Sequence, residues 1–356
     1  MSSQDNIWAG LALSAVATVL ALLFLELGFR LATGVPAFSY ENWRLRHVEA
    51  NRLDHRATFD PLLGWSNRAH YTSDGFNTLE HGIRRNFDER DIRTNAILAV
   101  GDSFTEGWDD VRDEETWPAQ LERLTGTPVV NGGVGGYGTD QIILRAEQLL
   151  EIVRPKALIV GFFEEDILRA GYAPYGGPKP YFTLENGKLL YHPPQIESGS
   201  QIGTRSSFGN GVREVLGYSV VADLIFGRLA PTYWYAGANL SYRKVGNDPV
   251  AVTCALLGRL KVRADASRIP VLLFMQHGWA AITENDQPSD NAQRVTTCAG
   301  MAGVEVVDEF ASLRTIAATD AEAFKTYYTM EGNTYWHMSA KGNMHAAELI
   351  ARGLQD

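Results

Sequence analysis

The chain has 356 residues, 45% hydrophobic and 21% charged, which is enough for one large or two small packed domains. Its 42 acidic and 32 basic side chains give a net charge of −10 without a dense basic run, which argues against nucleic acid as a partner. Cys254 and Cys298 form neither a CxxC pair nor a cluster with histidines, so the sequence offers no metal site and indicates no cofactor. One disulfide would be compatible with an oxidising compartment.

Residues 7–25 form an uncharged run without proline, IWAGLALSAVATVLALLFL, which is long enough to cross a lipid bilayer as a helix. No basic stretch precedes the run and no small-residue cleavage site follows it, which favours an uncleaved anchor over a signal peptide. We therefore predict a membrane anchor at residues 1–34. Glu26 and Arg30 lie just beyond the run and are expected to pair on one helix face, or else to contact a membrane-protein partner.

The orientation of this anchor is less clearly encoded. Arginines follow the run at positions 30, 44, 46, 52 and 56, whereas no Lys or Arg precedes it. Taken alone, the positive-inside rule would leave the main domain in the cytoplasm. Large domains translocate despite such charges, so the rule decides little here.

The region after the anchor changes character at about residue 95. Residues 35–94 show no sustained periodicity and are predicted to be an irregular or short-strand lead-in segment. Beyond them, apolar runs alternate with helical stretches, which is typical of parallel strands joined by crossover helices. The predicted strands are AILAVGD, TPVVNGG, KALIVGF, IPVLLFMQ and VEVVDEF, and the predicted helices lie near residues 116–124, 139–152, 249–267, 292–301 and 339–354.

The pattern predicts an α/β domain at residues 95–356 with a doubly wound, five-stranded parallel sheet. An insertion at about 171–247 interrupts the alternation. It contains YFTLENGKLLYH, two apolar-alternating runs around Asn186 and Gly187, which predicts a hairpin. Cys254 and Cys298 are expected on helices that flank the strand at 270–276.

Candidate chemistry lies in the turns after strands, because ligands of open α/β sheets bind beyond the carboxyl ends of the strands. In the turn at 101–107, Ser103 lies between a strand and a helix, and the structural alternative is a helix-capping serine. The turn at 131–139 holds five glycines, which would let backbone amides face an anion. Its glycine spacing is not that of a dinucleotide-binding motif.

The third turn, at residues 161–169, places Glu164, Glu165 and Asp166 directly after a strand, where acidic side chains are also favoured simply by the helix dipole. His337 lies just before the last predicted helix. A single histidine in a loop is more often structural than functional, so His337 gains weight only together with the three turns.

Together these four pieces resemble the SGNH (GDSL-like) hydrolase family. The sequence GDSFTEG at 101–107 matches its first block, the glycine loop at 131–138 its second, and His337 its last. The resemblance covers roughly residues 57–354, and GGYGTDQ and the hairpin around LENGK look like bacterial members with an N-terminal anchor. It implies an SGNH/flavodoxin-like three-layer sandwich, held by a single pass in the bacterial inner membrane with the main domain in the periplasm.

The resemblance also implies acyl transfer from an ester. Ser103 would attack the carbonyl carbon, His337 would accept its proton, and the amides of Ser103 and Gly136 would hold the oxyanion. The serine oxygen is then expected near hydrogen-bonding distance of an imidazole nitrogen. The implied substrate is an O-acyl ester of a carbohydrate or lipid, and both hydrolysis and transfer to another acceptor stay open.

Two departures from the family pattern bear on activity. Glu165, followed by Asp166, stands where the family has an Asn that donates to the oxyanion. In an active enzyme, either burial must raise the pKa of Glu165 so that it is protonated, or its side chain must turn away. Positions 334 and 335 hold no Asp to orient His337, a task that Glu331 or Glu165 would have to take over. The alternative function is therefore a catalytically degenerate SGNH domain that serves as a glycan-binding or membrane-complex subunit.

Overall fold

The chain divides into two units, which are described separately. The computed structural model describes residues 3–32, 56–108, 111–195, 212–213, 215–230, 234, 243–331 and 334–354. Residues 1–54 and 197–241 make one unit, and residues 55–196 and 242–356 make the other. The described part of the lead-in and the first part of the insertion lie in the unit that contains the sheet. Residues 35–55 of the predicted lead-in lie outside the described residues.

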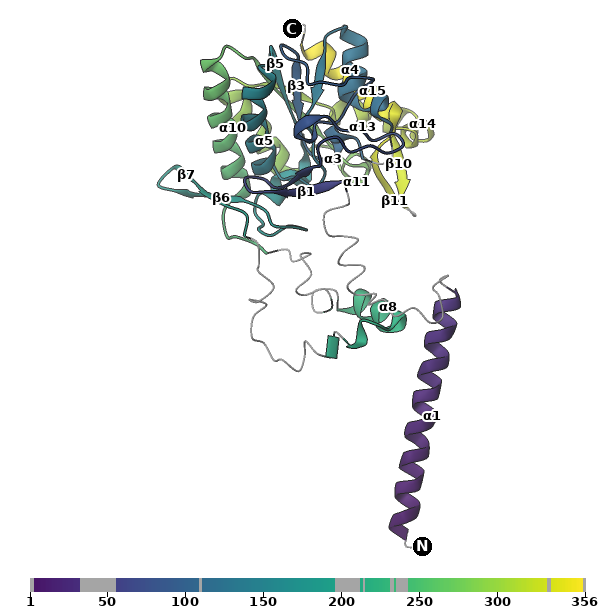
Figure 1. The fold of residues 1–356 in the computed structure, drawn as a ribbon. Coiled ribbons are helices and arrows are strands. Elements are labelled where there is room, and N and C mark those ends of the chain that lie inside the picture. Colours follow the sequence, from purple (N-terminus) through teal and green to yellow (C-terminus); the bar gives the residue numbers. More distant parts are fainter. Residues whose placement is uncertain are drawn as a thin grey trace. The chain divides into compact units, whose positions relative to one another are not determined.

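A five-stranded parallel sheet forms the centre of the larger unit (Figure 1). Its strands in spatial order are β4 (Val129–Asn131), β3 (Ile97–Val100), β5 (Ala157–Phe163), β8 (Val271–Gln276) and β9 (Glu305–Asp308). The predicted number of strands and their parallel direction are thereby confirmed. The strand order reverses at β3, which has β4 on one side and β5 on the other, and crevices for ligands open at such a point.

Helices cover both faces of the sheet because successive strand residues point to opposite sides. On one face, Ile97, Ala99 and Ile159 belong to a core cluster with Trp117 and Ile350. The helices of this layer are α4 (Trp117–Thr125), α13 (Phe310–Thr319) and α15 (Ala340–Gly353). The opposite layer comprises α5 (Thr139–Val153), α10 (Pro249–Ala266) and α12 (Asp290–Met301). The unit is thus the three-layer sandwich expected from the sequence.

Shorter elements connect or extend these layers. The short helices are α3 (Ser103–Glu106), α6 (Glu164–Arg169), α11 (Trp279–Glu284) and α14 (Ala321–Lys325), with 3-10 turns at Glu80–Gly82 and Asp113–Glu115. Three antiparallel pairs complete the unit: β1 (Ala57–Asp60) with β2 (Gly64–Asn67), β6 (Tyr181–Glu185) with β7 (Lys188–His192), and β10 (Tyr328–Glu331) with β11 (Thr334–Met338). Asn186 and Gly187 join β6 to β7 with positive φ angles of 50° and 77°, as a two-residue hairpin turn requires, so the predicted hairpin is confirmed.

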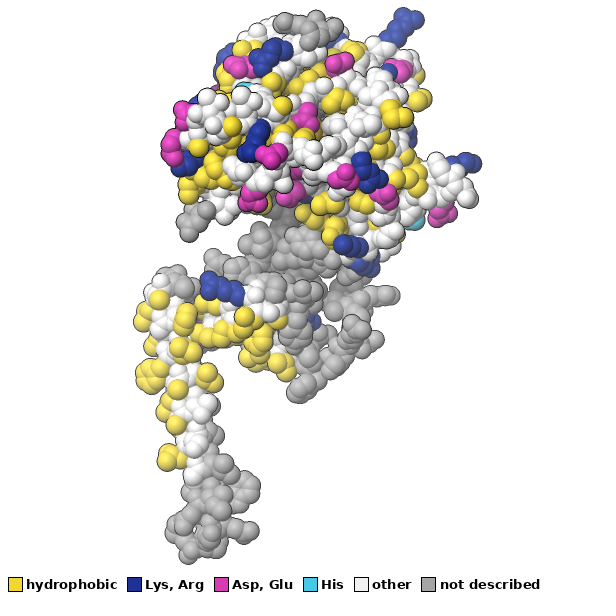
Figure 2. Space-filling view, turned by 180° about the vertical axis from the view of Figure 1, so that it is seen from behind, with side chains coloured by type: hydrophobic (Ala, Val, Ile, Leu, Met, Phe, Trp, Pro, Cys, Tyr) yellow, Lys and Arg dark blue, Asp and Glu magenta, His cyan; other side chains and the backbone are white. Residues whose placement is uncertain are grey.

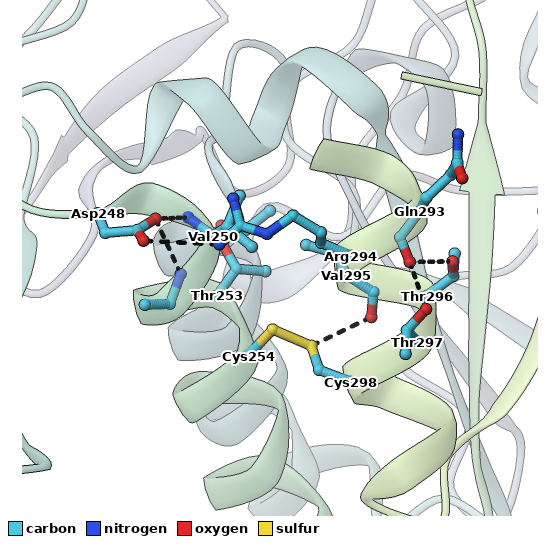
Figure 3. Close-up of a disulfide and its surroundings, with 12 residues drawn as sticks. Asp248, Val250, Thr253, Cys254, Gln293, Arg294, Val295, Thr296, Thr297 and Cys298 are labelled. Atoms are coloured by element: carbon cyan, nitrogen blue, oxygen red, sulfur yellow. Dashed lines mark hydrogen bonds and ion pairs between the residues drawn. A yellow bond between two sulfur atoms is a disulfide. The ribbon is translucent and has the colours of Figure 1, made fainter. Parts of the chain in front are cut away.

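A disulfide joins the two helices that were expected to carry the cysteines (Figure 3). Cys254 on α10 and Cys298 on α12 have their Cα atoms 5.8 Å apart and their sulfur atoms bonded. The two helices contact each other in the same layer, and α12 packs on β8 and β9. The bond therefore links two segments that are 44 residues apart in sequence across one face of the domain.

The smaller unit contains α1 (Ser3–Ala32) and α8 (Val220–Leu229). Glu26 and Arg30 of α1 form the expected ion pair at 2.7 Å, and Glu26 also accepts hydrogen bonds from Ser219 and Val220 at the start of α8. Hydrophobic side chains gather along α1 (Figure 2). Among the described residues, no helix combines the length and apolar character needed to cross a membrane. The structure therefore does not support the transmembrane helix predicted at residues 7–25.

Candidate active site

Ser103 opens helix α3 directly after strand β3. The cap of this helix is Asp102, whose side chain accepts a hydrogen bond from the amide of Phe104 at 2.9 Å. The alternative of a helix-capping serine is therefore wrong, and the Ser103 hydroxyl is left for another partner. The Ser103 side chain is buried at the carboxyl end of β3, beside the point where the strand order reverses.

His337, near the carboxyl end of the chain, contacts Ser103. Its Nε2 atom lies 3.0 Å from Ser103 Oγ, although the two residues are 234 positions apart in sequence. The imidazole is buried and contacts the rings of Phe104 and Trp108, with centroids 5.4 Å and 5.6 Å away. His337 lies in strand β11 rather than in the loop inferred from the sequence. The structure thus brings together the two side chains that the sequence singled out.

The glycine loop lies against the serine turn. The amide of Val134 donates to the carbonyl oxygen of Gly101, and a Cβ atom at Gly133 would lie 2.4 Å from the Glu106 nitrogen, so only glycine fits this approach. Gly136 has a φ of 77°. Among the described residues, neither the amide of Gly136 nor that of Ser103 donates a hydrogen bond to the protein. Neither predicted oxyanion donor therefore has a hydrogen-bond acceptor among the described residues.

The lead-in segment holds this loop in place, a role that the sequence did not indicate. Trp65 of β2 donates from Nε1 to the carbonyl oxygen of Gly135 at 3.1 Å, and its own carbonyl oxygen accepts from Tyr137 at 2.5 Å. Asn67 donates to the buried carboxylate of Glu106 at 2.7 Å. Burial raises the pKa of Glu106 above its ordinary value, although Asn67 and nearby cations partly offset the effect. Strand β2 is thus part of the candidate site.

The three acidic residues after β5 enter three different environments. Glu164 turns toward His277, with its Oε2 atom 3.5 Å from Nδ1. The candidate auxiliary Glu165 is exposed, whereas the candidate auxiliary Asp166 is fully buried and accepts a hydrogen bond from the amide of Phe163. Burial, followed by the neighbouring Asp102, raises the pKa of Asp166 well above its ordinary value. Glu331, the third candidate, ends β10, and its side chain lies outside what the structure describes.

A second buried histidine lies at the same edge of the sheet. His277 follows β8, and its Nε2 atom lies 2.9 Å from Asp308 at the end of β9. Burial lowers the pKa of His277, but the hydrogen bonds with Asp308 and Glu164 outweigh that effect and raise it to about 9. The amide of His277 donates to Glu309, whose pKa is raised to about 8 by burial. His277 is therefore a buried cation among carboxylates at neutral pH.

No group of three or more His, Cys, Asp or Glu side chains within the described ranges is arranged to hold a metal ion. The cluster around His277 accordingly stands as an ion-pair network. The chemistry that the described site offers is that of a serine hydroxyl beside an imidazole and two available amides.

No family model matches the chain, and no curated protein matches it either. Solved structures do resemble it. A catalytic mutant of an acetylxylan esterase from Geobacillus stearothermophilus is 13% identical, with 74% of this chain and 95% of that chain covered and a TM-score of 0.41. A lipase/acylhydrolase from Enterococcus faecalis is 13% identical, with 73% and 95% covered and a TM-score of 0.38.

A GDSL-like lipase from Bacteroides thetaiotaomicron is also 13% identical, with 73% of this chain and 88% of that chain covered and a TM-score of 0.35. Identities and TM-scores this low do not carry an activity from one protein to another. What this chain does must follow from its own site.

Proposed function

We propose that the protein is a serine ester hydrolase or acyltransferase. The observation that carries the proposal is the 3.0 Å contact between Ser103 Oγ and His337 Nε2 at the carboxyl end of the parallel sheet. A general base must lie within hydrogen-bonding reach of the proton that it removes, and this pair satisfies that requirement. Ser103 is the nucleophile of the proposed reaction and His337 is its base.

In the proposed reaction, Ser103 Oγ attacks the carbonyl carbon of an ester while His337 Nε2 accepts the serine proton. The negative charge that develops on the carbonyl oxygen is stabilised by the amides of Ser103 and Gly136. The bond to the leaving alcohol then breaks, and the alcohol departs with the proton from His337. Water or a second alcohol, activated by the same imidazole, releases the acyl group from Ser103.

The proposed oxyanion site has one donor fewer than the related family pattern. Glu165 is exposed, so its carboxylate can remain solvated and turned away from the developing charge. Two backbone amides then stabilise the oxyanion. In other serine enzymes, removal of one oxyanion donor lowers the rate by about 100- to 1000-fold. A slow enzyme is consistent with this arrangement. If no turnover occurs, the same site would serve a binding subunit instead.

The proposed substrate is an O-acyl ester of a carbohydrate or a lipid. Trp336 is 49% exposed beside His337, and Trp108 is stacked against His337. Aromatic faces of this kind favour apolar or ring-shaped groups over small charged ones. Whether water or another alcohol accepts the acyl group depends on which of them reaches the acyl-serine first.

We further propose that residues 7–25 attach the protein to a bacterial inner membrane, with the sheet domain in the periplasm. The uncharged run and the exposed apolar side chains of α1 support attachment, and the Cys254–Cys298 disulfide supports an oxidising compartment. Extraction of cell membranes with alkaline carbonate tests this proposal. The full chain should stay with the membranes, and its recovery in the soluble fraction would contradict the proposal.

The enzymatic proposal is tested with p-nitrophenyl acetate and the purified full chain in detergent. Wild type should release p-nitrophenol and Ser103→Ala should not, while both retain the same circular dichroism spectrum. Ser312→Ala is a matched control, because Ser312 Oγ also lies 3.0 Å from a histidine, His345, outside the site. Equal rates for wild type and Ser103→Ala would refute the proposed nucleophile. A folded wild type that shows neither turnover nor labelling by a fluorophosphonate would favour the binding subunit.

A further inference from the structure

One arginine contacts all three turns that follow β3, β4 and β5. Arg169 is the last residue of α6, and its Nη1 atom donates to Asp166 at 2.7 Å, to Asp102 at 3.0 Å and to the carbonyl oxygen of Tyr137 at 3.0 Å. Asp102 belongs to the serine turn, Tyr137 to the glycine loop and Asp166 to α6. The three acceptors therefore come from the three segments that surround the proposed reaction centre.

The contact with Asp102 leads directly to the proposed nucleophile. The Oδ2 atom of Asp102 that accepts from Arg169 lies 3.4 Å from Ser103 Oγ, while its Oδ1 atom accepts from the amide of Phe104. Both carboxylate oxygens are thus held, one by the cation and one by the start of α3. Any movement of Asp102 would change the direction of the Ser103 hydroxyl relative to His337.

The contact with Tyr137 is a second hold on the glycine loop, in addition to that of Trp65. A Cβ atom at Gly138 would lie 2.9 Å from the Cβ atom of Arg169, so the loop packs directly on the arginine side chain. The guanidinium carbon also lies 5.9 Å from the ring centre of Phe163 and 5.7 Å from that of Tyr175. These cation–π contacts and the three hydrogen bonds from one guanidinium nitrogen restrict the orientation of the group, which a lysine side chain does not reproduce.

Charge explains why a cation is needed at this point. Asp102 and Asp166 are both buried, and both carboxylates accept a hydrogen bond from the same Nη1 atom of Arg169. Burial lowers the pKa of Arg169, but Asp166 and Asp102 outweigh that effect and raise it, so the guanidinium stays charged. Without it, two buried carboxylates would be left without a counter-charge, and one or both would move or take up a proton.

We infer that Arg169 is a positioning residue for the proposed reaction: its guanidinium holds the Asp102–Ser103 turn and the glycine loop in the mutual arrangement that ester hydrolysis requires. The inference rests on the proposed function and adds to it a residue that does not touch the reacting atoms. A misplacement of about 1 Å in such a site costs on the order of 100-fold in rate.

The experiment compares Arg169→Ala, Arg169→Lys and the control Arg259→Ala in the full chain with p-nitrophenyl acetate. Arg259 also holds a carboxylate with two hydrogen bonds, to Glu147 at 2.9 Å and 3.0 Å, but on helices α10 and α5 away from the serine turn. Arg169→Ala should lower kcat by about 100-fold with little change in KM, and Arg169→Lys should lose less. Arg259→Ala should keep the wild-type kcat.

Chemical rescue separates positioning from a general structural role. Guanidinium ion, at concentrations far below those that unfold the protein, should restore part of the kcat of Arg169→Ala, while sodium at the same ionic strength should not. If Arg169→Ala fails to fold, the double variant Arg169→Met/Asp166→Asn removes the cation together with one buried carboxylate. When folded, this double variant should still be slow in turnover and in labelling by a fluorophosphonate.

Three outcomes would overturn the inference. Wild-type kcat in folded Arg169→Ala would do so, as would wild-type turnover in the double variant. If the activity falls only in proportion to the fraction of folded protein, and guanidinium does not rescue it, the role of Arg169 would be purely structural. An unreactive wild type would refute the proposed function itself, and that result is distinguishable from the other three because it precedes any mutation.

Discussion

Two serine–histidine pairs in this molecule have the same separation and very different surroundings. Ser103 and His337 are buried at the carboxyl end of the sheet, beside two amides that make no hydrogen bond to the described protein. Ser312 and His345 join helices α13 and α15 at the same 3.0 Å, half-buried on the outside of a layer. Distance alone therefore does not make a catalytic pair. The position at the strand ends and the neighbouring glycine loop distinguish the first pair from the second.

A third histidine extends the comparison. His277 lies at the same edge of the sheet as His337, but carboxylates surround it rather than a hydroxyl and aromatic rings. Its raised pKa keeps it protonated at neutral pH, and a protonated imidazole cannot accept a proton. The neighbours of a histidine, more than its place on the sheet, thus decide between a base and a structural cation.

The largest expected effect distinguishes the two serine–histidine pairs. His337→Gln should lower kcat/KM for p-nitrophenyl acetate by about 10,000-fold, because Ser103 loses the group that accepts its proton. His345→Gln, the matched change in the other pair, should leave the rate unchanged. Steady-state kinetics on both variants checks this. Similar losses in the two variants would break the distinction between the pairs.

The second effect concerns stability rather than rate. His277→Gln should lower the free energy of unfolding by about 3 kcal/mol, because Asp308 and Glu164 lose the cation buried between them. Urea unfolding followed by circular dichroism measures the change, and kcat should fall far less than in His337→Gln. An unchanged midpoint would show that the network contributes nothing to the fold.

The pH dependence of stability should reveal the same network. The pKa of His277 is raised from 6.5 to about 9, so its contribution is complete below pH 6.5 and is lost as the pH rises to about 9. The pKa of Glu309 is raised from 4.5 to about 8, so its buried carboxyl group also reduces the stability as the pH rises from 4.5 to about 8. Wild type should therefore lose stability from pH 6.5 to 9, and His277→Gln should show a flatter curve. Parallel curves would contradict this origin.

Trp65→Phe tests whether the lead-in segment shapes the serine site. The change keeps an aromatic ring but removes the hydrogen bond from Nε1 to the carbonyl oxygen of Gly135. Greater freedom of the glycine loop should lower kcat by about 10-fold, with KM little changed. Kinetics on Trp279→Phe, whose ring stacks on Tyr335, provides a control for the loss of an indole group. A larger effect in the control would indicate that general packing, and not the loop, is responsible.

The last expected effect concerns Glu165, which stands where the family that the motifs resemble has a donor. Glu165→Asn should raise ester hydrolysis by about 10-fold, because an amide group can donate where a carboxylate cannot. The free energy of unfolding should stay the same, since Glu165 is exposed. Loss of activity would instead mean that the carboxylate has a catalytic task, such as orienting His337.

The architecture of the sheet domain followed from local pattern. Apolar runs such as ILAV at 97–100, the helical periodicity between them and the Asn186–Gly187 turn each act over a few residues, so each can be recognised without the rest of the chain. The serine turn and the glycine loop were found for the same reason. The strand that carries His337 was missed, because its short apolar segment gains strand character only by pairing with β10.

The sequence by itself determined the five strands and their helices, the hairpin and the residues suited to a serine reaction. Only the tertiary structure decided how these residues are held. Arg169 and Asp102 are 67 positions apart, and Trp65 and Gly135 are 70 apart, and no periodicity links either pair. Hydrophobic spacing encodes which face of an element is buried, whereas the partner of a buried polar group depends on which distant segment folding brings within 3 Å of it.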